Sequence, residues 1–213
     1  ASHDPIVVIG DFTMVAACWL AGVTGITYLD VYKTGHGRLY AAPERWVIAR
    51  VCRRVFVRSE PLTQGLRRAG VAAEAAGNVM MDTITGSGYD ARARRAHSLA
   101  VTLLPGSRDQ TVENFALQVE ALRRLPAAER PDIFLALAGA ATPDDLAVAA
   151  GLTVDGDRMT GDLVVHFARR AMRDMVEASD LVLSQAGTAT IQALGLGVPA
   201  ITFTRPTSCS SCG

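Results

Sequence analysis

The chain has 213 residues, of which 49% are hydrophobic, and its 21 basic residues balance its 21 acidic residues. This is enough apolar material for one large domain or two small ones. The charge balance provides no overall field that attracts nucleic acid, so we expect no nucleic-acid partner. No apolar run approaches the roughly 18 residues of a membrane span, and the first residues lack the basic region of a secretory signal. We therefore expect a cytoplasmic protein.

Short apolar runs alternate with amphipathic stretches along the whole chain, a pattern typical of βαβ units around a parallel sheet. The sequence therefore predicts the α/β class. Pro43 and Pro61 suit the first turns of helices, where the missing N–H costs nothing. In the first half we predict strands at 5–10, 25–29, 54–57 and 73–75, and helices at 13–21, 43–52 and 61–69.

Hydrophobic periodicity fails between residues 82 and 97, where Gly86, Ser87 and Gly88 cluster. We interpret this segment as a hinge and expect two domains, residues 1–84 and residues 85–213. In the second domain we predict strands at 99–104, 133–138, 163–167, 180–183 and 200–203, and helices at 112–125, 144–150, 169–178 and 190–196.

The segment from residue 38 to residue 68 is unusually basic, with eight arginines against Glu44 and Glu60. Solvated helix faces are one interpretation, and an anion-binding or membrane-touching patch is the other. The four cysteines are too few and too scattered for a disulfide framework. We expect Cys18 and Cys52 to be core residues. We interpret the lone pair Cys209 and Cys212 as part of a disordered or artificial tail, and a metal site is the alternative.

Ligands of open parallel sheets bind outside the carboxyl ends of the strands, which makes the residues after each strand the candidates for a site. One such turn follows the strand that ends at Leu104. There Gly106 allows close backbone approach, Ser107 offers a hydroxyl, and Arg108 offers a bidentate guanidinium suited to a phosphate. An ordinary strand-to-helix turn with an exposed arginine is the alternative.

A second turn, residues 184–192, lies between an apolar strand and an apolar helix. Small residues there would bring a ligand close to backbone N–H groups, and the start of the helix favours a pyrophosphate. A helix cap with small packing residues is the alternative. The candidate nucleotide-sugar-binding residues of this turn are Gln185, Gly187, Thr188, Ala189, Thr190 and Gln192, of which Gln192 would reach a ribose hydroxyl.

The stretches LLPGSR and ASDLVLSQAGTATIQALGLGVPAITF resemble the two donor-domain signatures of lipid-A-disaccharide synthase and its related proteins, which are GT-B glycosyltransferases. The stretches IGDF, VFVRSEPLTQGLRRAGV and AGNVMMD agree with that family in order. The resemblance implies two Rossmann-like domains. It also implies that the acceptor-side domain, residues 1–84, is incomplete at its start and that the closing helix after Phe203 is missing.

The resemblance implies a UDP-sugar donor and a hydroxyl acceptor, which in this family is a lipid or glycolipid reached at the inner face of the membrane. Asp11, after the first strand, matches the position of a general base, and a helix N-cap is its alternative role. No DxD-like motif follows a suitable strand, so we expect no metal and no cofactor besides the UDP-sugar substrate. A nucleotide-sugar epimerase or hydrolase, and a non-catalytic binding module, remain alternatives.

Overall fold

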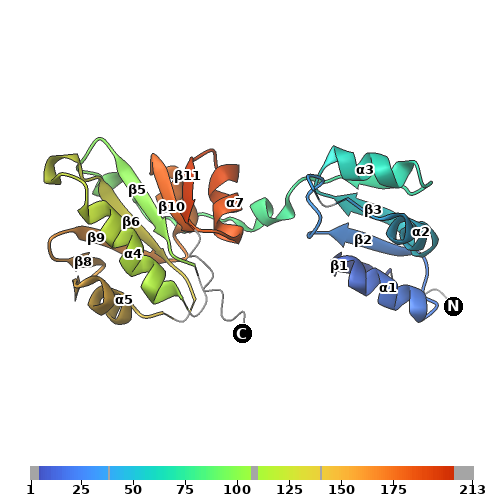
Figure 1. The fold of residues 1–213 in the computed structure, drawn as a ribbon, viewed down its shortest axis with the longest axis horizontal. Coiled ribbons are helices and arrows are strands. Elements are labelled where there is room, and N and C mark those ends of the chain that lie inside the picture. The colour runs from blue at the N-terminus through green and yellow to red at the C-terminus, as the bar shows by residue number, and fades with distance from the viewer. Residues whose placement is uncertain (1–4, 38, 107–109, 140, 204–213) are drawn as a thin grey trace, which may run out of the picture. The chain divides into compact units, whose positions relative to one another are not determined.

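A computed structural model of the chain describes residues 5–37, 39–106, 110–139 and 141–203. The chain divides into two compact units, Ala1–Thr83 and Ile84–Gly213, which we call unit 1 and unit 2. Each unit has its own sheet (Figure 1). Each unit also buries its own apolar side chains. Among the described residues, no helix combines the length and the apolar character that a membrane crossing requires.

The described part of unit 1 is a parallel sheet of four strands in the order β1-β2-β3-β4, so each strand pairs with the next one along the chain. Three helices connect the strands, as the alternating pattern predicts. The strands are β1 (Val7–Gly10), β2 (Ile26–Asp30), β3 (Cys52–Val57) and β4 (Ala73–Ala75), and the helices are α1 (Phe12–Leu20), α2 (Ala42–Val51) and α3 (Glu60–Arg67).

Local sequence signals explain where the helices of unit 1 begin. The Asp11 carboxylate accepts the Thr13 N–H at 2.9 Å and caps α1. Pro43 and Pro61 lie in the first turns of α2 and α3, as we predicted. Buried side chains from all three helices, among them Val15, Ile48 and Leu62, join the sheet in one core.

Cys18 and Cys52 are both half-buried and pack against this core, close to the core position that we expected for them. Burial, with a smaller contribution from neighbouring Cys18, raises the pKa of Cys52 to about 12. Because the thiolate is the nucleophilic form of cysteine, a raised pKa disfavours reaction of this thiol at neutral pH.

A buried carboxylate organises the loop between β2 and α2. Asp30 is only 2% exposed and accepts the backbone N–H groups of Tyr32 at 2.7 Å and Lys33 at 3.0 Å, together with the Tyr40 hydroxyl. Lys33 in turn donates to the Leu39 carbonyl at 3.1 Å and to the Glu44 carboxylate at 3.0 Å. These contacts hold the loop against the start of α2.

The described part of unit 2 contains a seven-stranded sheet in the order β11-β10-β5-β6-β9-β8-β7. Its strands are β5 (Ala100–Leu104), β6 (Asp132–Leu137), β7 (Thr153–Asp155), β8 (Arg158–Thr160), β9 (Val164–Arg169), β10 (Leu181–Gln185) and β11 (Ala200–Phe203). All pairs from β11 to β9 are parallel, and β7 and β8 add antiparallel pairs at one edge.

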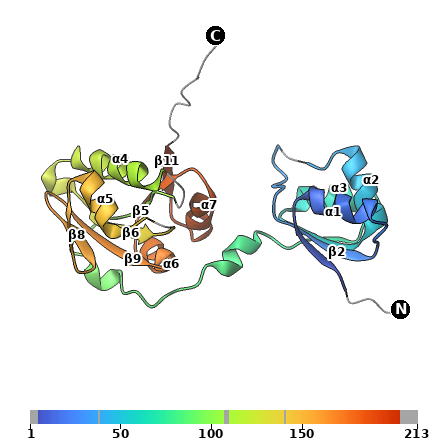
Figure 2. The same cartoon turned by 90° about the horizontal axis from the view of Figure 1, so that it is seen from below.

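Helices cover both faces of this sheet. Each face packs against its own cluster of buried side chains. On one face, α4 (Thr111–Arg123) and α5 (Pro143–Ala150) supply residues such as Phe115 and Leu146. On the other, α6 (Met172–Glu177) and α7 (Thr188–Gly195) supply residues such as Met175. Figure 2 shows α4 and α5 on one side of the sheet and α6 on the other. β5 and β6, buried along their whole length, lie between the two layers.

The two antiparallel strands β7 and β8 were not predicted, because each is only three residues long. The expected helix at 169–178 was too long at its start. Arg169 ends β9, Arg170 has a backbone φ of 60°, and the helix begins at Met172. The left-handed conformation of Arg170 cannot continue a right-handed helix, so the chain turns there instead.

Asp132, at the start of β6, forms hydrogen bonds that hold the segment preceding β5 in place. It accepts the Ala96 N–H at 2.9 Å and the His97 N–H at 2.7 Å, and its other oxygen lies 2.8 Å from His97 Nδ1. Burial favours the neutral carboxyl, but these hydrogen bonds to the charged form outweigh it and hold the pKa of Asp132 below its usual value.

We expect Asp132→Asn to destabilise unit 2 at neutral pH and much less in acid. A lowered folded-state pKa means that the stabilisation is complete above the unfolded-state pKa, near 3.8, and is lost as the pH falls through the folded-state pKa. Urea unfolding followed by far-UV circular dichroism between pH 3 and pH 7 measures this. A difference between the two proteins that stays constant down to pH 3 would contradict the role of this carboxylate.

Candidate functional site

Unit 2 contains a cavity of about 980 Å³ at the carboxyl ends of β5, β6, β9 and β10. This is where open parallel sheets bind ligands, and the volume suits a molecule of nucleotide-sugar size. It is lined by Leu104, Pro105, Gly106, Gln110, Thr111, Asn114, Ala136, Leu137, Ala138, Gly139, Arg169, Arg170, Met172, Gln185, Ala186, Gly187, Thr188, Ala189 and Gln192.

The turn after β5 contributes the first predicted site residue, Gly106, which has a φ of 99°. Glycine tolerates this left-handed conformation, whereas other residues are strained in it. Among the described residues, a Cβ at this position would approach the Gln185 side chain, at 3.9 Å. Ser107 and Arg108, the two other residues predicted here, lie outside the described residues.

The turn after β10 contributes the second group, and here α7 starts directly at the cavity. Gly187 is the N-cap of α7, and it has no side chain that could accept the first N–H groups of the helix. Thr188 is exposed and lines the cavity together with Ala189. Since the first N–H groups of a helix have no partner within the helix, they are available to an anion in the cavity.

Thr190 differs from the other predicted residues, because it does not line the cavity. Its hydroxyl lies 2.9 Å from the buried Ser184 hydroxyl and donates to the Gln185 carbonyl at 3.2 Å. It therefore holds the turn in place instead of presenting a donor to a ligand. Gln185 and Gln192 both line the cavity, as expected.

Two side-chain amide oxygens at the cavity have no hydrogen-bond partner within the described structure, those of Asn114 and Gln185. Asn114 is 3% exposed, and its amide nitrogen donates to the Pro105 carbonyl at 2.9 Å, which fixes the turn after β5. A buried acceptor without a partner costs free energy unless a ligand or water donates to it. The cavity thus offers acceptors as well as the N–H groups of α7.

Two arginines at the cavity were missed by the sequence analysis. Arg169 donates to the carbonyls of Gly139 at 3.0 Å and Ala141 at 2.9 Å, and so ties the end of β9 to the loop after β6. Arg170 is exposed, and within the described ranges it is the non-glycine residue with positive φ. Strained backbone of this kind concentrates at functional sites. The adjacent arginines after a predicted strand were the available signal, but we assigned them to a helix.

Asp11, the predicted general base, lies in unit 1 and is exposed at the carboxyl end of β1. Its capping bond to Thr13 realises the alternative structural role. A carboxylate that accepts one hydrogen bond retains further lone pairs, so the two roles are compatible. The catalytic role stays a prediction.

No family model and no curated protein matches this chain. Among solved structures, the fold is similar to a Listeria monocytogenes protein assigned as a UDP-N-acetylglucosamine 2-epimerase, with a TM-score of 0.55 and 16% sequence identity. The match covers 92% of this chain and 55% of the Listeria protein, so the chain spans about half the length of that structure. The chain has an α/β, GT-B-like fold with two Rossmann-like domains.

Proposed function

We propose that unit 2 binds a UDP-sugar in the cavity at the carboxyl ends of its parallel strands. The observation that carries this proposal is the convergence of the Gly106 turn and the N-terminus of α7 on one cavity of about 980 Å³. The N–H groups of α7 would hold the diphosphate, and Gly106 would let the backbone approach it. Arg170, Gln185 and Gln192 would contact the rest of the donor.

We propose further that the protein acts on the sugar of this donor as a glycosyltransferase. The resemblance to lipid-A-disaccharide synthase and its relatives supports transfer to a hydroxyl of a lipid or glycolipid. Asp11 would accept the proton of that hydroxyl as its oxygen attacks the anomeric carbon and UDP leaves. The helix N-terminus would stabilise the negative charge that develops on the departing diphosphate.

Epimerisation of the sugar is the second candidate, because the Listeria protein of similar fold is assigned as a UDP-N-acetylglucosamine 2-epimerase. The two reactions differ in their need for an acceptor. Incubating the chain with UDP-N-acetylglucosamine alone and separating the products would distinguish them. An epimerised sugar favours the second candidate, whereas release of UDP that depends on an added acceptor favours transfer.

Calorimetric titration of the purified chain with UDP and UDP-N-acetylglucosamine tests the binding step itself. We expect both to bind and AMP and NAD to bind much more weakly, because neither phosphate turn has the dinucleotide-binding pattern GxGxxG followed by an acidic residue. No binding of either uridine nucleotide would reject the proposed site.

A further inference from the structure

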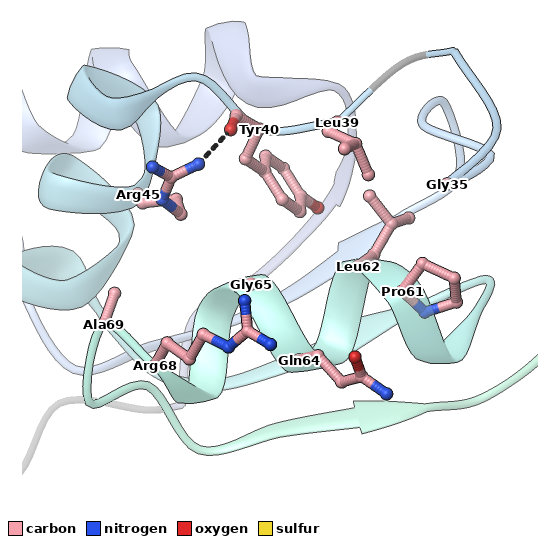
Figure 3. Close-up of a pocket in the computed structure, with 10 residues that line it drawn as sticks. All are labelled: Gly35, Leu39, Tyr40, Arg45, Pro61, Leu62, Gln64, Gly65, Arg68 and Ala69. Atoms are coloured by element: carbon pink, nitrogen blue, oxygen red, sulfur yellow. Dashed lines mark hydrogen bonds between the residues drawn. The ribbon is translucent and has the colours of Figure 1, made fainter.

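Unit 1 has a cavity of its own, distinct from the nucleotide cavity of unit 2. Its volume is about 490 Å³, and it lies between the loop that precedes α2, the start of α2, and α3 (Figure 3). Its lining residues are Gly35, Leu39, Tyr40, Arg45, Pro61, Leu62, Gln64, Gly65, Arg68 and Ala69. This volume is within the range of small-molecule sites.

Much of the lining is apolar, and part of the space is left by a missing side chain. Leu39, Pro61 and Leu62 come together at one end of the cavity (Figure 3). Gly65 lies inside α3, and a Cβ built on it would meet no atom within 4 Å. Glycine in a helix interior is less favourable than alanine by about 1 kcal/mol. The glycine thus leaves open space at a cost to the helix.

Two guanidinium groups line this cavity from different helices. Arg45 comes from α2 and is half-buried, and Arg68 is the C-cap of α3. One N–H of Arg45 donates to the Tyr40 carbonyl, as Figure 3 shows. Since a guanidinium has five N–H donors, Arg45 keeps others for a ligand.

The acidic groups around the cavity are already engaged elsewhere. Glu44 accepts from Lys33 at 3.0 Å, and Glu60 pairs with Arg67 at 3.2 Å. The buried Asp30 accepts its three bonds within the loop. Among the described residues, no carboxylate lines the cavity and none forms an ion pair with Arg45 or Arg68.

We propose that this cavity binds a small amphiphilic anion, an organic phosphate or carboxylate with a compact apolar body. Its charged group lies between Arg45 and Arg68, and its apolar body lies against Leu39, Pro61 and Leu62. Both guanidinium groups line the same cavity, and charge-assisted N–H donors of this kind bind phosphate and carboxylate oxygens strongly. The excess of arginine in residues 38–68 is, at these two positions, a binding feature instead of a solvated helix face.

Titration of the full chain with hexyl phosphate tests this site, with inorganic phosphate and hexanol as the matched partial ligands. We expect hexyl phosphate to bind at least about tenfold more tightly than either, because only it uses both the guanidinium groups and the apolar wall. Equal affinity for hexyl phosphate and hexanol would overturn the role of the arginines. Binding to anionic phospholipid vesicles without binding of hexyl phosphate would overturn the proposal in favour of a membrane surface.

Substitutions can test the two arginines and the open space beside Gly65 separately. Arg45→Gln and Arg68→Gln should each weaken hexyl phosphate binding by about tenfold or more, whereas Arg53→Gln, an exposed arginine on β3 outside the cavity, should not change it. Gly65→Leu keeps both arginines, fills the open space and improves the helix, so it should lose binding without unfolding. Unchanged affinity in Gly65→Leu would place the ligand elsewhere.

The inference does not depend on the proposed UDP-sugar site. Saturating UDP should leave the affinity for hexyl phosphate unchanged, since the two cavities belong to different units. Displacement of hexyl phosphate by UDP would show that it binds in the nucleotide cavity, which would overturn this proposal and leave the function of unit 2 standing.

Discussion

Replacement of Thr188 by glutamate should greatly weaken UDP binding while leaving unit 2 fully folded. A carboxylate at the first position of α7 would lie where the donor diphosphate is expected, and like charges brought together cost several kcal/mol. We expect the affinity for UDP to fall by about 100-fold or more. Calorimetric titration at low salt measures this loss.

The same substitution should not lower the stability of unit 2. A loss of UDP binding can therefore not be attributed to unfolding. An acidic residue in the first turn favours a helix by about 0.3–1 kcal/mol, and the first turn of α7 has none. Thermal unfolding followed by circular dichroism should therefore show an unchanged or higher midpoint. Thr188→Gln is the matched neutral control and should lose at most about tenfold in affinity. Equal affinities of the two variants would refute an anion site at α7.

Asp30→Ala should destabilise unit 1 by about 3–5 kcal/mol, a large part of the stability of a small domain. The alanine would leave three donors without their acceptor in a buried place: the N–H groups of Tyr32 and Lys33 and the Tyr40 hydroxyl. Asp11→Ala is the control, because it removes one exposed cap bond and should cost about 1 kcal/mol.

Tryptophan fluorescence isolates this effect, because both tryptophans of the chain, Trp19 and Trp46, lie in unit 1. Their rings contact edge to face with centroids 5.6 Å apart, so unfolding of unit 1 separates them. Denaturant titration of the emission should show a lower midpoint for Asp30→Ala than for Asp11→Ala. The reverse order would mean that the loop before α2 is not anchored through Asp30.

Much of the fold could be predicted because its signals are local. Every strand of unit 1 was expected, and β4 and β11 have the predicted bounds. A run such as β5 is buried at all five positions, and four of the five are apolar. Its one polar residue, Thr102, has its hydroxyl 2.7 Å from the Ser179 hydroxyl. A short, nearly continuous apolar run of this kind is distinguished from the amphipathic helices that flank it. The expected α/β class with two Rossmann-like domains is confirmed by the structure and by the similar Listeria protein.

The candidate site could be predicted only in part, for a physical reason. Gly106, Gly187 and Thr188 lie two or three residues after the end of a strand, and the rule that ligands bind at strand carboxyl ends identifies them. Asn114 lies a turn inside α4, and its contribution depends on which way its amide points once Pro105 is in place. The position of Arg170 at the cavity depends on its left-handed backbone conformation, which the hydrophobic pattern of the sequence does not indicate.

The hairpin of β7 and β8 escaped prediction because its strands are too short for a period to be recognised. The signal available was the dipeptide Gly156-Asp157 between them, a two-residue connection in which glycine takes a φ of 62°. It lies between two three-residue segments. The pairing of β7 with β8 and of β8 with β9 brings together parts of the chain that no local pattern relates.

This hairpin also bears on how the protein behaves at high concentration. A long, flat parallel strand at the edge of a sheet offers a row of free backbone groups to another molecule and invites aggregation. Here β9 is instead covered by β8, and the strands that follow are three residues long and carry the Arg158–Asp155 ion pair at 2.9 Å. The outermost strand, β7, therefore offers few free backbone groups to a strand of a neighbouring molecule. We expect this edge of unit 2 to resist intermolecular sheet formation.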